Sequence, residues 1–268
     1  VADNSAAAAT STDGITWTAR TLPSSASWTS VTHGDGTFVA VSDAYAAAAT
    51  STDGITWTAR TLPSSAFWTS VTYGDGTFVA VDSFYAAAAS STDGITWTAG
   101  TMTSSVSWQS ITYGDGTFVA VAYYSAVANT STDGTTWTAG TMPSSAGWYS
   151  VTYGDGIFVA VAYFSAAAAS STDGITWTAR TLPSSKSWTS VTHGDGTFVA
   201  VSGGVFDSDA AATSTDGITW TARTLPSSNS WISVTHVDGT FVAVADNSAA
   251  AATSPDGITW TAGTITSS

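Results

Sequence analysis

Tryptophan recurs along this chain at a fixed spacing, and that period constrains the fold more than any other feature of the sequence. Two sets of tryptophans follow the same steps of 40 residues, with one step of 43 between the fifth and sixth members. The first set is Trp17, Trp57, Trp97, Trp137, Trp177, Trp220 and Trp260, and the second is Trp28, Trp68, Trp108, Trp148, Trp188 and Trp231. Together they account for all 13 tryptophans. A period of this length predicts a repeat architecture in which neighbouring units stack on one another.

Each repeat contains the pattern of two β-hairpins. In residues 26–65, β-branched and aromatic residues alternate with polar ones, and two Asp-Gly turns interrupt the alternation. The strands are predicted at 27–33, 37–41, 46–52 and 55–60, and are named A, B, C and D in chain order. One such sheet cannot bury both of its faces alone. The sequence therefore predicts an all-β fold, a β-propeller of four-stranded antiparallel blades, with a linear stack of the same sheets as the alternative.

The number of blades is harder to derive than their structure. Six blades are preferred, at 26–65, 66–105, 106–145, 146–185, 186–228 and 229–268, preceded by an extra outer C–D hairpin or half-blade at 1–25. The opening segment VADNSAAAATS recurs from residue 244, so the chain has one more C–D hairpin than A–B hairpins. Three arrangements stay open. The spare hairpin docks outside a six-bladed ring or exchanges with a neighbouring molecule; it belongs to a seven-bladed ring that lacks one A–B hairpin; or it continues an open array.

The C–D turns resemble a known motif. Ser-Thr-Asp-Gly-Ile-Thr-Trp is similar to the Asp-box of bacterial neuraminidase repeats, in a form one residue shorter than the usual one. The wider pattern, VTYGDGTFVAV followed by TSTDGITWTA, resembles repeats of Asp-box propellers in bacterial and phage surface proteins. That family includes sialidases, assembly factors, lectin-like modules and adhesins, so the resemblance implies a fold and not one activity. The turn carboxylates are expected to be structural, because a short carboxylate accepts backbone N–H bonds from its own turn; they are Asp13, Asp53, Asp93, Asp133, Asp173, Asp216 and Asp256.

The charge balance excludes several classes of partner. All 19 acidic residues are Asp, only five Lys and Arg oppose them, and the net charge is −14. Nucleic acids and anionic membranes are therefore not expected as partners, because both require clusters of Lys and Arg. No apolar run reaches the ~20 residues of a membrane-spanning helix, and no cysteine is present. No cofactor is predicted.

An inventory of catalytic side chains leads to the prediction that the chain is not an enzyme. A sialidase would need a cluster of three Arg and a Tyr/Glu pair, whereas this chain has four Arg at one repeat position and no Glu. Other glycosidases need a close carboxylate pair, and none is evident. His33, His193 and His236 occupy the position that Tyr holds in three other repeats, which is typical of a packing residue and not of a metal ligand. No metal site and no catalytic residue are predicted.

Variation between repeats is concentrated in the B–C loops. The Asp residues outside the regular turns all lie there, and so does the only insertion, within SGGVFDSDAAAT. The aromatic residues that depart from the repeat are Tyr45, Phe84, Tyr85, Tyr123, Tyr124, Tyr163, Phe164 and Phe206 in these loops, with Phe67 and Tyr149 at the start of strand A. Because loops on a rigid scaffold carry binding residues, these ten are predicted to form a ligand-binding face.

The sequence thus predicts a non-enzymatic binding or adhesion propeller that recognises a glycan or a surface protein through its aromatic B–C face. The alternative is a structural repeat subunit of an extracellular fibre, a phage tail or another surface assembly. Self-association through the spare hairpin is a further expectation, as is a location outside the cell, on a cell surface or on a virion.

Overall fold

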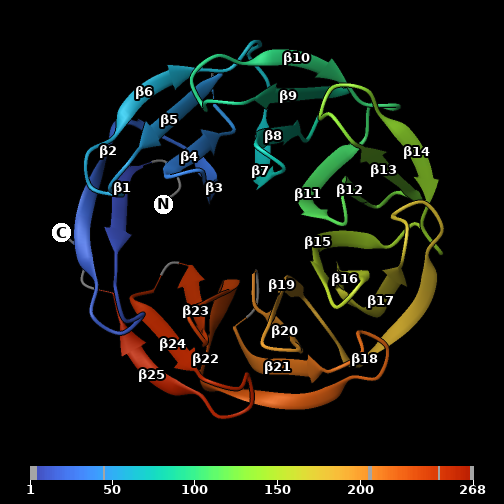
Figure 1. The fold of residues 1–268 in the computed structure, drawn as a ribbon. Coiled ribbons are helices and arrows are strands. Elements are labelled where there is room, and N and C mark those ends of the chain that lie inside the picture. The colour runs from blue at the N-terminus through green and yellow to red at the C-terminus, as the bar shows by residue number, and fades with distance from the viewer. Residues whose placement is uncertain (1–4, 45, 205–206, 247, 266–268) are drawn as a thin grey trace.

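The chain forms a closed ring of β-sheets around a central axis (Figure 1). The computed structural model describes residues 5–44, 46–204, 207–246 and 248–265. Within these residues every regular element is a strand, and six four-stranded antiparallel units share the ring with one two-stranded hairpin. The prediction of an all-β propeller is confirmed. None of the described segments is a helix long and apolar enough to cross a membrane.

In each unit the first strand lies nearest the axis and the fourth lies at the rim (Figure 1). The first unit contains β3 (Trp28–Gly34), β4 (Thr37–Ser42), β5 (Ala47–Ser51) and β6 (Thr58–Thr61). The second contains β7 (Trp68–Gly74), β8 (Thr77–Asp82), β9 (Ala87–Ser91) and β10 (Thr98–Thr101). The third contains β11 (Ser107–Gly114), β12 (Thr117–Tyr123), β13 (Val127–Ser131) and β14 (Thr138–Thr141).

The fourth unit contains β15 (Gly147–Gly154), β16 (Ile157–Tyr163), β17 (Ser165–Ser171) and β18 (Thr178–Lys186). The fifth begins with β19 (Trp188–Gly194), β20 (Thr197–Ser202) and β21 (Ser208–Ser214). A long strand, β22 (Thr221–Val237), then pairs with β21 as far as Asn229 and with the sixth unit from Ser230 onward. The sixth unit is completed by β23 (Thr240–Asp246), β24 (Ala250–Ser254) and β25 (Thr261–Thr264).

The spare hairpin takes a seventh place in the ring. It consists of β1 (Ser5–Thr10) and β2 (Thr18–Ala26) and lies between the sixth and the first units (Figure 1). A parallel bridge joins Thr16 to Thr264 of the sixth unit, as equivalent bridges join the outer loops of other neighbours. On the other side, Leu22 packs in one cluster with Trp28, Ala40 and Ala49 of the first unit. The hairpin is therefore the outer half of a seventh sector.

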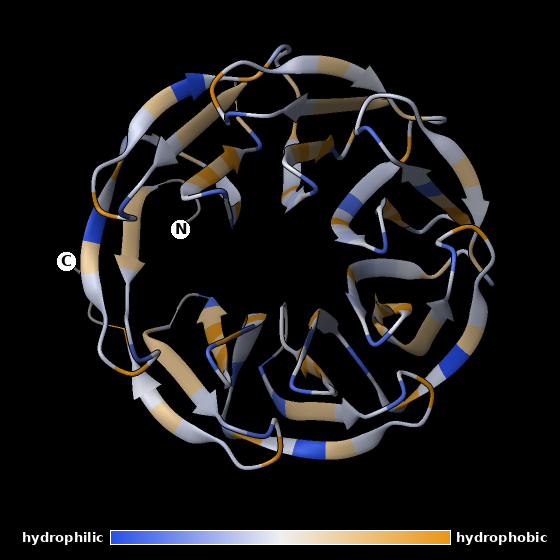
Figure 2. Cartoon of the chain, in the orientation of Figure 1, coloured by the Kyte–Doolittle hydropathy of each residue, from blue (hydrophilic) through white to orange (hydrophobic). Residues whose placement is uncertain are grey.

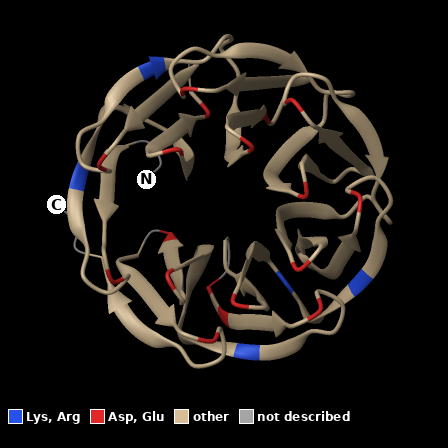
Figure 3. Ribbon diagram, in the orientation of Figure 1, with Lys and Arg blue, Asp and Glu red and all other residues tan. Residues whose placement is uncertain are grey.

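The core lies between neighbouring units. Trp68, Trp108, Trp148, Trp188 and Trp231 are fully buried, as are the second-strand phenylalanines Phe78, Phe118, Phe158, Phe198 and Phe241. Each cluster combines residues of two adjacent units, for example Val39 with Trp68 and Trp97. In Figure 2 the outermost strands are mostly pale, with blue segments, whereas orange lies on the inner strands and on the loops at the rim. The blue segments correspond to the arginines, which Figure 3 places on the rim, far apart from one another.

The two kinds of Asp-Gly turn differ in structure. The A–B turns have positive φ at both central residues, as at Asp75 (46°) and Gly76 (74°), which is the type I′ geometry that the sequence predicts. The C–D connection is longer than predicted, because strand D begins at Thr58 and not at Ile55. The backbone N–H groups of Ile55 and Thr56 donate to Asp53 Oδ1, both at 2.8 Å, so they are not available to a strand ladder.

The C–D turn carboxylates accept hydrogen bonds within their own turns. Ser51 Oγ accepts from Gly54 N–H at 2.9 Å and donates to Asp53 Oδ1 at 2.9 Å, and the same pattern recurs around the ring. The backbone N–H of Thr56, then that of Ile55, and the Ser51 hydroxyl lower the pKa of Asp53. In the spare hairpin the equivalent bonds from Thr16 and Ile15 lower the pKa of Asp13 to about 2.

Candidate functional site

The aromatic residues predicted at the B–C loops form two clusters at one end of the ring. This end is opposite the A–B turns, since each second strand runs from an A–B turn to a B–C loop. In the second unit, Phe67 packs against Phe84 with ring centroids 4.8 Å apart and stacks on Tyr85 at 6.4 Å. All three rings are exposed. Tyr45 and Phe206 lie outside the described residues.

Buried Asp82 organises the first of these clusters. Its Oδ2 accepts from Phe67 N–H at 2.8 Å, and its Oδ1 accepts from the N–H groups of Phe84 and Tyr85. Burial raises the pKa of Asp82, and the three backbone N–H bonds oppose that rise. One carboxylate thus fixes the backbone that carries all three aromatic rings.

The larger group, the tyrosine cluster, consists of Tyr123, Tyr124, Tyr149, Tyr163 and Phe164 from the third and fourth units. Ring centroids are 4.2 Å apart for Tyr123 and Tyr124, 5.0 Å for Tyr149 and Tyr163, and 4.2 Å for Tyr163 and Phe164. Tyr124 and Phe164 are 61% and 48% exposed, as predicted for surface rings. Tyr163 is only 9% exposed, so the expectation that its ring lies on the binding face is wrong. Its hydroxyl packs against Gly204, within the insertion of the next unit.

The tyrosine cluster is partly desolvated and faces acidic groups. Burial, followed by the hydrogen bond with Tyr124, raises the pKa of Tyr123 to about 12. Burial also raises the pKa of Tyr149, and the charges of Tyr163 and Asp246 add to that effect. Beside Phe164, a shallow recess of about 260 Å³ is lined by Lys186, Asp207 and serine side chains. The raised pKa values keep the phenols of Tyr123 and Tyr149 neutral at pH 7, and both rings offer apolar faces with O–H donors.

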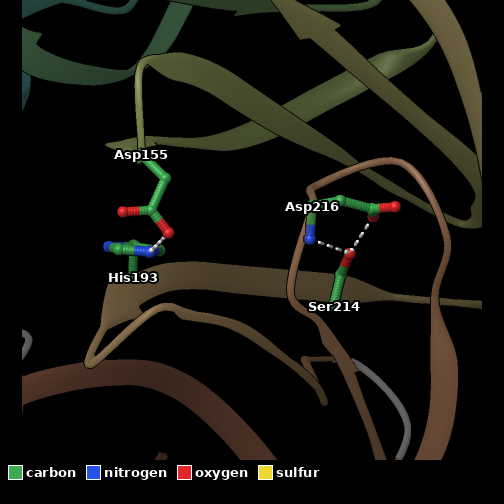
Figure 4. A network of polar contacts seen from close by, with 4 residues as sticks. All are labelled: Asp155, His193, Ser214 and Asp216. Atoms are coloured by element: carbon green, nitrogen blue, oxygen red, sulfur yellow. Dashed lines mark hydrogen bonds and ion pairs between the residues drawn. The ribbon is translucent and has the colours of Figure 1, made fainter.

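The opposite end carries two His–Asp pairs that the sequence analysis did not predict. His193 Nε2 lies 3.0 Å from Asp155 Oδ2 of the preceding unit (Figure 4), and His236 Nε2 lies 3.2 Å from Asp195 Oδ2. Each imidazole is 14% exposed, whereas the two carboxylates are 56% and 64% exposed. His193 also packs on Phe198 at 4.5 Å, so the ring has the packing role expected from its exchange with Tyr. The partner carboxylate comes from a turn about one repeat earlier, which the spacing alone could not reveal.

Nothing in the described structure indicates a resident metal. No group of three or more His, Cys, Asp or Glu side chains lies together there. The A–B turn aspartates lie in different units, and two of them, Asp155 and Asp195, each pair with a histidine of the next unit.

Comparisons with known proteins identify the fold and no family. No family model matches the chain, so its resemblance to Asp-box repeats stays a prediction, and no curated protein matches it. Among solved structures, virginiamycin B lyase from Staphylococcus aureus is similar with a TM-score of 0.80 and 14% identity, over 90% of this chain and 85% of that one. A catalytically inactive His-to-Ala variant of that lyase with quinupristin gives a TM-score of 0.79 at 14% identity, over 89% and 84%. YCF48 bound to D1 peptide gives 0.69 at 17% identity, over 90% and 83%.

These structures overturn the functional prediction made from the sequence. Propellers of the same shape include lyases, so the prediction of a non-enzymatic adhesion module, its alternative of a structural assembly subunit, and the prediction that the chain is not an enzyme are contradicted. The inventory failed because it tested only the side chains that sialidases and glycosidases need. It treated each histidine as a packing residue and did not consider the carboxylate that the neighbouring unit brings to it.

Proposed function

We propose that the tyrosine cluster binds a polypeptide segment. The observation that supports this most is the backbone of Tyr124 and Phe164, whose φ angles of 50° and 55° lie in the left-handed region that favours glycine. Holding a residue with a side chain there costs ~1–3 kcal/mol. Both rings are exposed, so burial does not offset that cost. Each ring contacts one tyrosine of the cluster at 4.2 Å, and its exposed remainder is available to a ligand.

The chemistry of this end favours a segment that contains Lys or Arg. Asp207 lines the recess beside Phe164, and the charge of Asp246 acts on Tyr149. The whole chain carries a net charge of −14. Aromatic faces hold apolar and cationic side chains, and nearby carboxylates add attraction for a basic segment. The peptide bound to YCF48 supports a polypeptide as the ligand of a propeller of this shape.

The test is a peptide selection followed by titration. A random peptide display library is selected on the intact chain, and the enriched peptide is labelled and titrated at low and high salt. Tyr124→Gly and Phe164→Gly should each weaken binding by ~1–2 kcal/mol, since aromatic anchors supply most interface energy. Each change should alter stability little, because glycine fits the left-handed backbone and this gain offsets the loss of one ring contact. Ile175→Ala, which alters an exposed apolar residue at the opposite end, is the matched control. Unchanged affinity in the two glycine variants would contradict the proposal.

We propose as a second candidate an acid–base role for the His–Asp pairs. In each pair the carboxylate lies 3.0–3.2 Å from Nε2 and orients the imidazole. That arrangement gives a histidine the properties of a general base. A lyase of similar shape is inactive when a histidine is replaced by alanine, which supports testing elimination chemistry first.

The assay incubates the chain with quinupristin and follows its consumption by liquid chromatography coupled to mass spectrometry. His193→Tyr and His236→Tyr are the informative variants, because Tyr fills this position in three other units and preserves the packing. The proposal predicts turnover that at least one of these variants abolishes. Turnover that both variants retain, or its absence in the unaltered chain, would remove this candidate and leave the peptide-binding proposal unaffected.

A further inference from the structure

Two departures from the repeat meet at the recess beside Phe164. One is Lys186, the only lysine of the chain, which lies two residues before the tryptophan of a first strand and is exposed. Three other units have an apolar residue at this position that packs in a core cluster: Ala66, Val106 and Ala146. The other departure is the inserted B–C loop, which contributes Gly203 and Asp207 to the same recess.

Within the described chain, Lys186 has no polar partner. No described carboxylate forms an ion pair with its ammonium group, and no described residue accepts a hydrogen bond from it. Its neighbours in the repeat show that the position serves packing elsewhere, whereas an exposed lysine does not serve packing. A lysine ammonium is a compact positive charge with three donors, so Lys186 is available to an anionic group in the recess.

The adjacent Ser187 supplies a second donor, and this one is buried. Ser187 is 8% exposed and lines the recess, and its hydroxyl makes no hydrogen bond with any described residue. Serines at the same position in two other units do have partners. Ser107 accepts from Gln109 Nε2 at 3.0 Å. Ser230 accepts from Gly204 N–H, also at 3.0 Å. The O–H group of Ser187 is therefore left for an acceptor inside the recess.

The inserted loop limits the charge that the recess can accept. Ser208 holds this loop in place, since its Oγ lies 2.7 Å from Ser202 Oγ and accepts from Ala210 N–H at 3.1 Å. Asp207 precedes it, is exposed and also lines the recess. A group with two negative charges, such as a phosphate dianion, would be repelled by Asp207 and by the net charge of −14. One ammonium and one carboxylate together favour a group with a single negative charge that has a cation beside it.

We propose that this recess binds a carboxylate of the polypeptide segment, held by the Lys186 ammonium and the Ser187 hydroxyl beside the ring of Phe164. The inference rests on the proposed binding of a polypeptide at the tyrosine cluster, and it assigns the group of that segment that lies next to Phe164. A carboxylate carries one charge and accepts from both donors. A Lys or Arg next to it in the segment is attracted to Asp207. Two groups offer this chemistry: the α-carboxylate of a C terminus and the side chain of Asp or Glu.

The test compares neutral and charged forms of one labelled peptide, enriched on the intact chain from a library displayed with free C termini. The peptide is synthesised as the free acid, as the C-terminal amide, and with each Asp or Glu replaced by Asn or Gln. Fluorescence anisotropy should show at least one neutral form binding ~10-fold or more weakly, because it loses charge-assisted hydrogen bonds. The form that weakens identifies the source of the carboxylate. Inorganic phosphate should displace the peptide no better than chloride does at equal ionic strength.

Variants of the chain locate the carboxylate. Lys186→Met should weaken the free acid by the same ~10-fold but leave the weakened neutral form unchanged, because the contact requires both charges. Lys186→Arg, which keeps the charge, should retain most of the affinity. Ser187→Ala should weaken binding by ~2–10-fold. Arg180→Met removes the same charge from the rim part of the same strand, β18, and is the matched control that should have no effect.

The outcomes separate this inference from the proposal on which it rests. Equal binding of all peptide forms, strictly additive losses for Lys186→Met and the neutral form, or displacement by phosphate but not by chloride would overturn the carboxylate assignment and leave peptide binding intact. Absence of saturable binding by every form would overturn both.

Discussion

Replacing Gly114 by alanine should destabilise the ring through one identifiable clash. The added Cβ would lie 2.0 Å from Tyr153 Cγ, whereas carbon atoms in contact are ~3.5–4.0 Å apart. The Tyr153 ring would have to move, but its other side packs on Phe158 at 4.7 Å, and Phe158 is fully buried. Overpacking of this kind costs ~1–3 kcal/mol, and expulsion of the ring would add the loss of an aromatic contact of ~0.5–1.5 kcal/mol.

The decisive measurement is a double-mutant cycle. Tyr153→Ala alone should cost less than the ~3–5 kcal/mol typical of a fully buried aromatic, because the ring is half-buried. Once the ring is gone, Gly114→Ala should cost nothing, and in a strand it should even contribute ~0.5–1 kcal/mol through the lower chain entropy of alanine. The coupling energy between the two sites should therefore equal or exceed the cost of the single Gly114 change.

Urea unfolding followed by tryptophan fluorescence gives the four free energies of the cycle. Gly116→Ala is the control, because nothing lies within 4 Å of its Cβ position and its φ of +75° alone makes alanine unfavourable. That cost should persist when Tyr153 is replaced by alanine. Strictly additive losses for Gly114 and Tyr153 would refute the steric account of this interface.

Three further changes test the fold and the first aromatic cluster. Trp108→Ala should cost ~3–5 kcal/mol in urea unfolding, as for other buried aromatic truncations, and an unchanged midpoint would contradict its place in the core. Folding lowers the pKa of Asp53 and of the equivalent aspartates in the other C–D turns. These carboxylates therefore stabilise the fold at neutral pH. That stabilisation is lost as the pH falls from about 4, the ordinary pKa of Asp, toward their lower folded-state pKa values. A thermal midpoint that increases as the pH is lowered from 4 to 2 would contradict this prediction. Asp82→Ala should loosen Phe67 and Tyr85, visible as faster exchange of their backbone amides, since it removes the acceptor of those N–H groups.

The elements that depend on local chemistry could be predicted from the sequence, and those that depend on contacts between units could not. The A–B turns follow from Asp and Gly, which accept the positive φ that a type I′ turn requires. Strand D was placed three residues too early, because alternation of side chains does not show that Asp53 takes the N–H groups of Ile55 and Thr56. The burial of Tyr163 depends on Gly204, which belongs to an insertion in the next unit.

The His–Asp pairs were missed for the same reason. Asp155 and His193 are in different units, and only the angle between these units brings the two side chains to 3.0 Å. A comparison of the repeats does reveal one departure that affects contacts between units: Val237 replaces the glycine that five other units have at this position. The steric meaning of this change is clear only from the structure, which places a Tyr or His ring of the next unit against each of those five glycines.

Because the repeats are nearly identical, the positions at which one unit differs from the others show which contacts between units it can make. Where the first strand of a unit joins the next one, Thr29, Thr69 and Thr189 donate their hydroxyls to a tryptophan carbonyl, at 2.6, 2.8 and 2.6 Å. The sixth unit has Ile232 at this position, which cannot donate, and Val237 at the glycine position, which cannot receive a ring. Both changes fall on the face that no complete unit covers, and they affect contacts that an ordinary seventh blade would make. The sixth unit is therefore not a generic repeat: Ile232 cannot make the hydroxyl contact of Thr29, Thr69 and Thr189, and Val237 leaves no room for the ring that the glycine of the other units accepts.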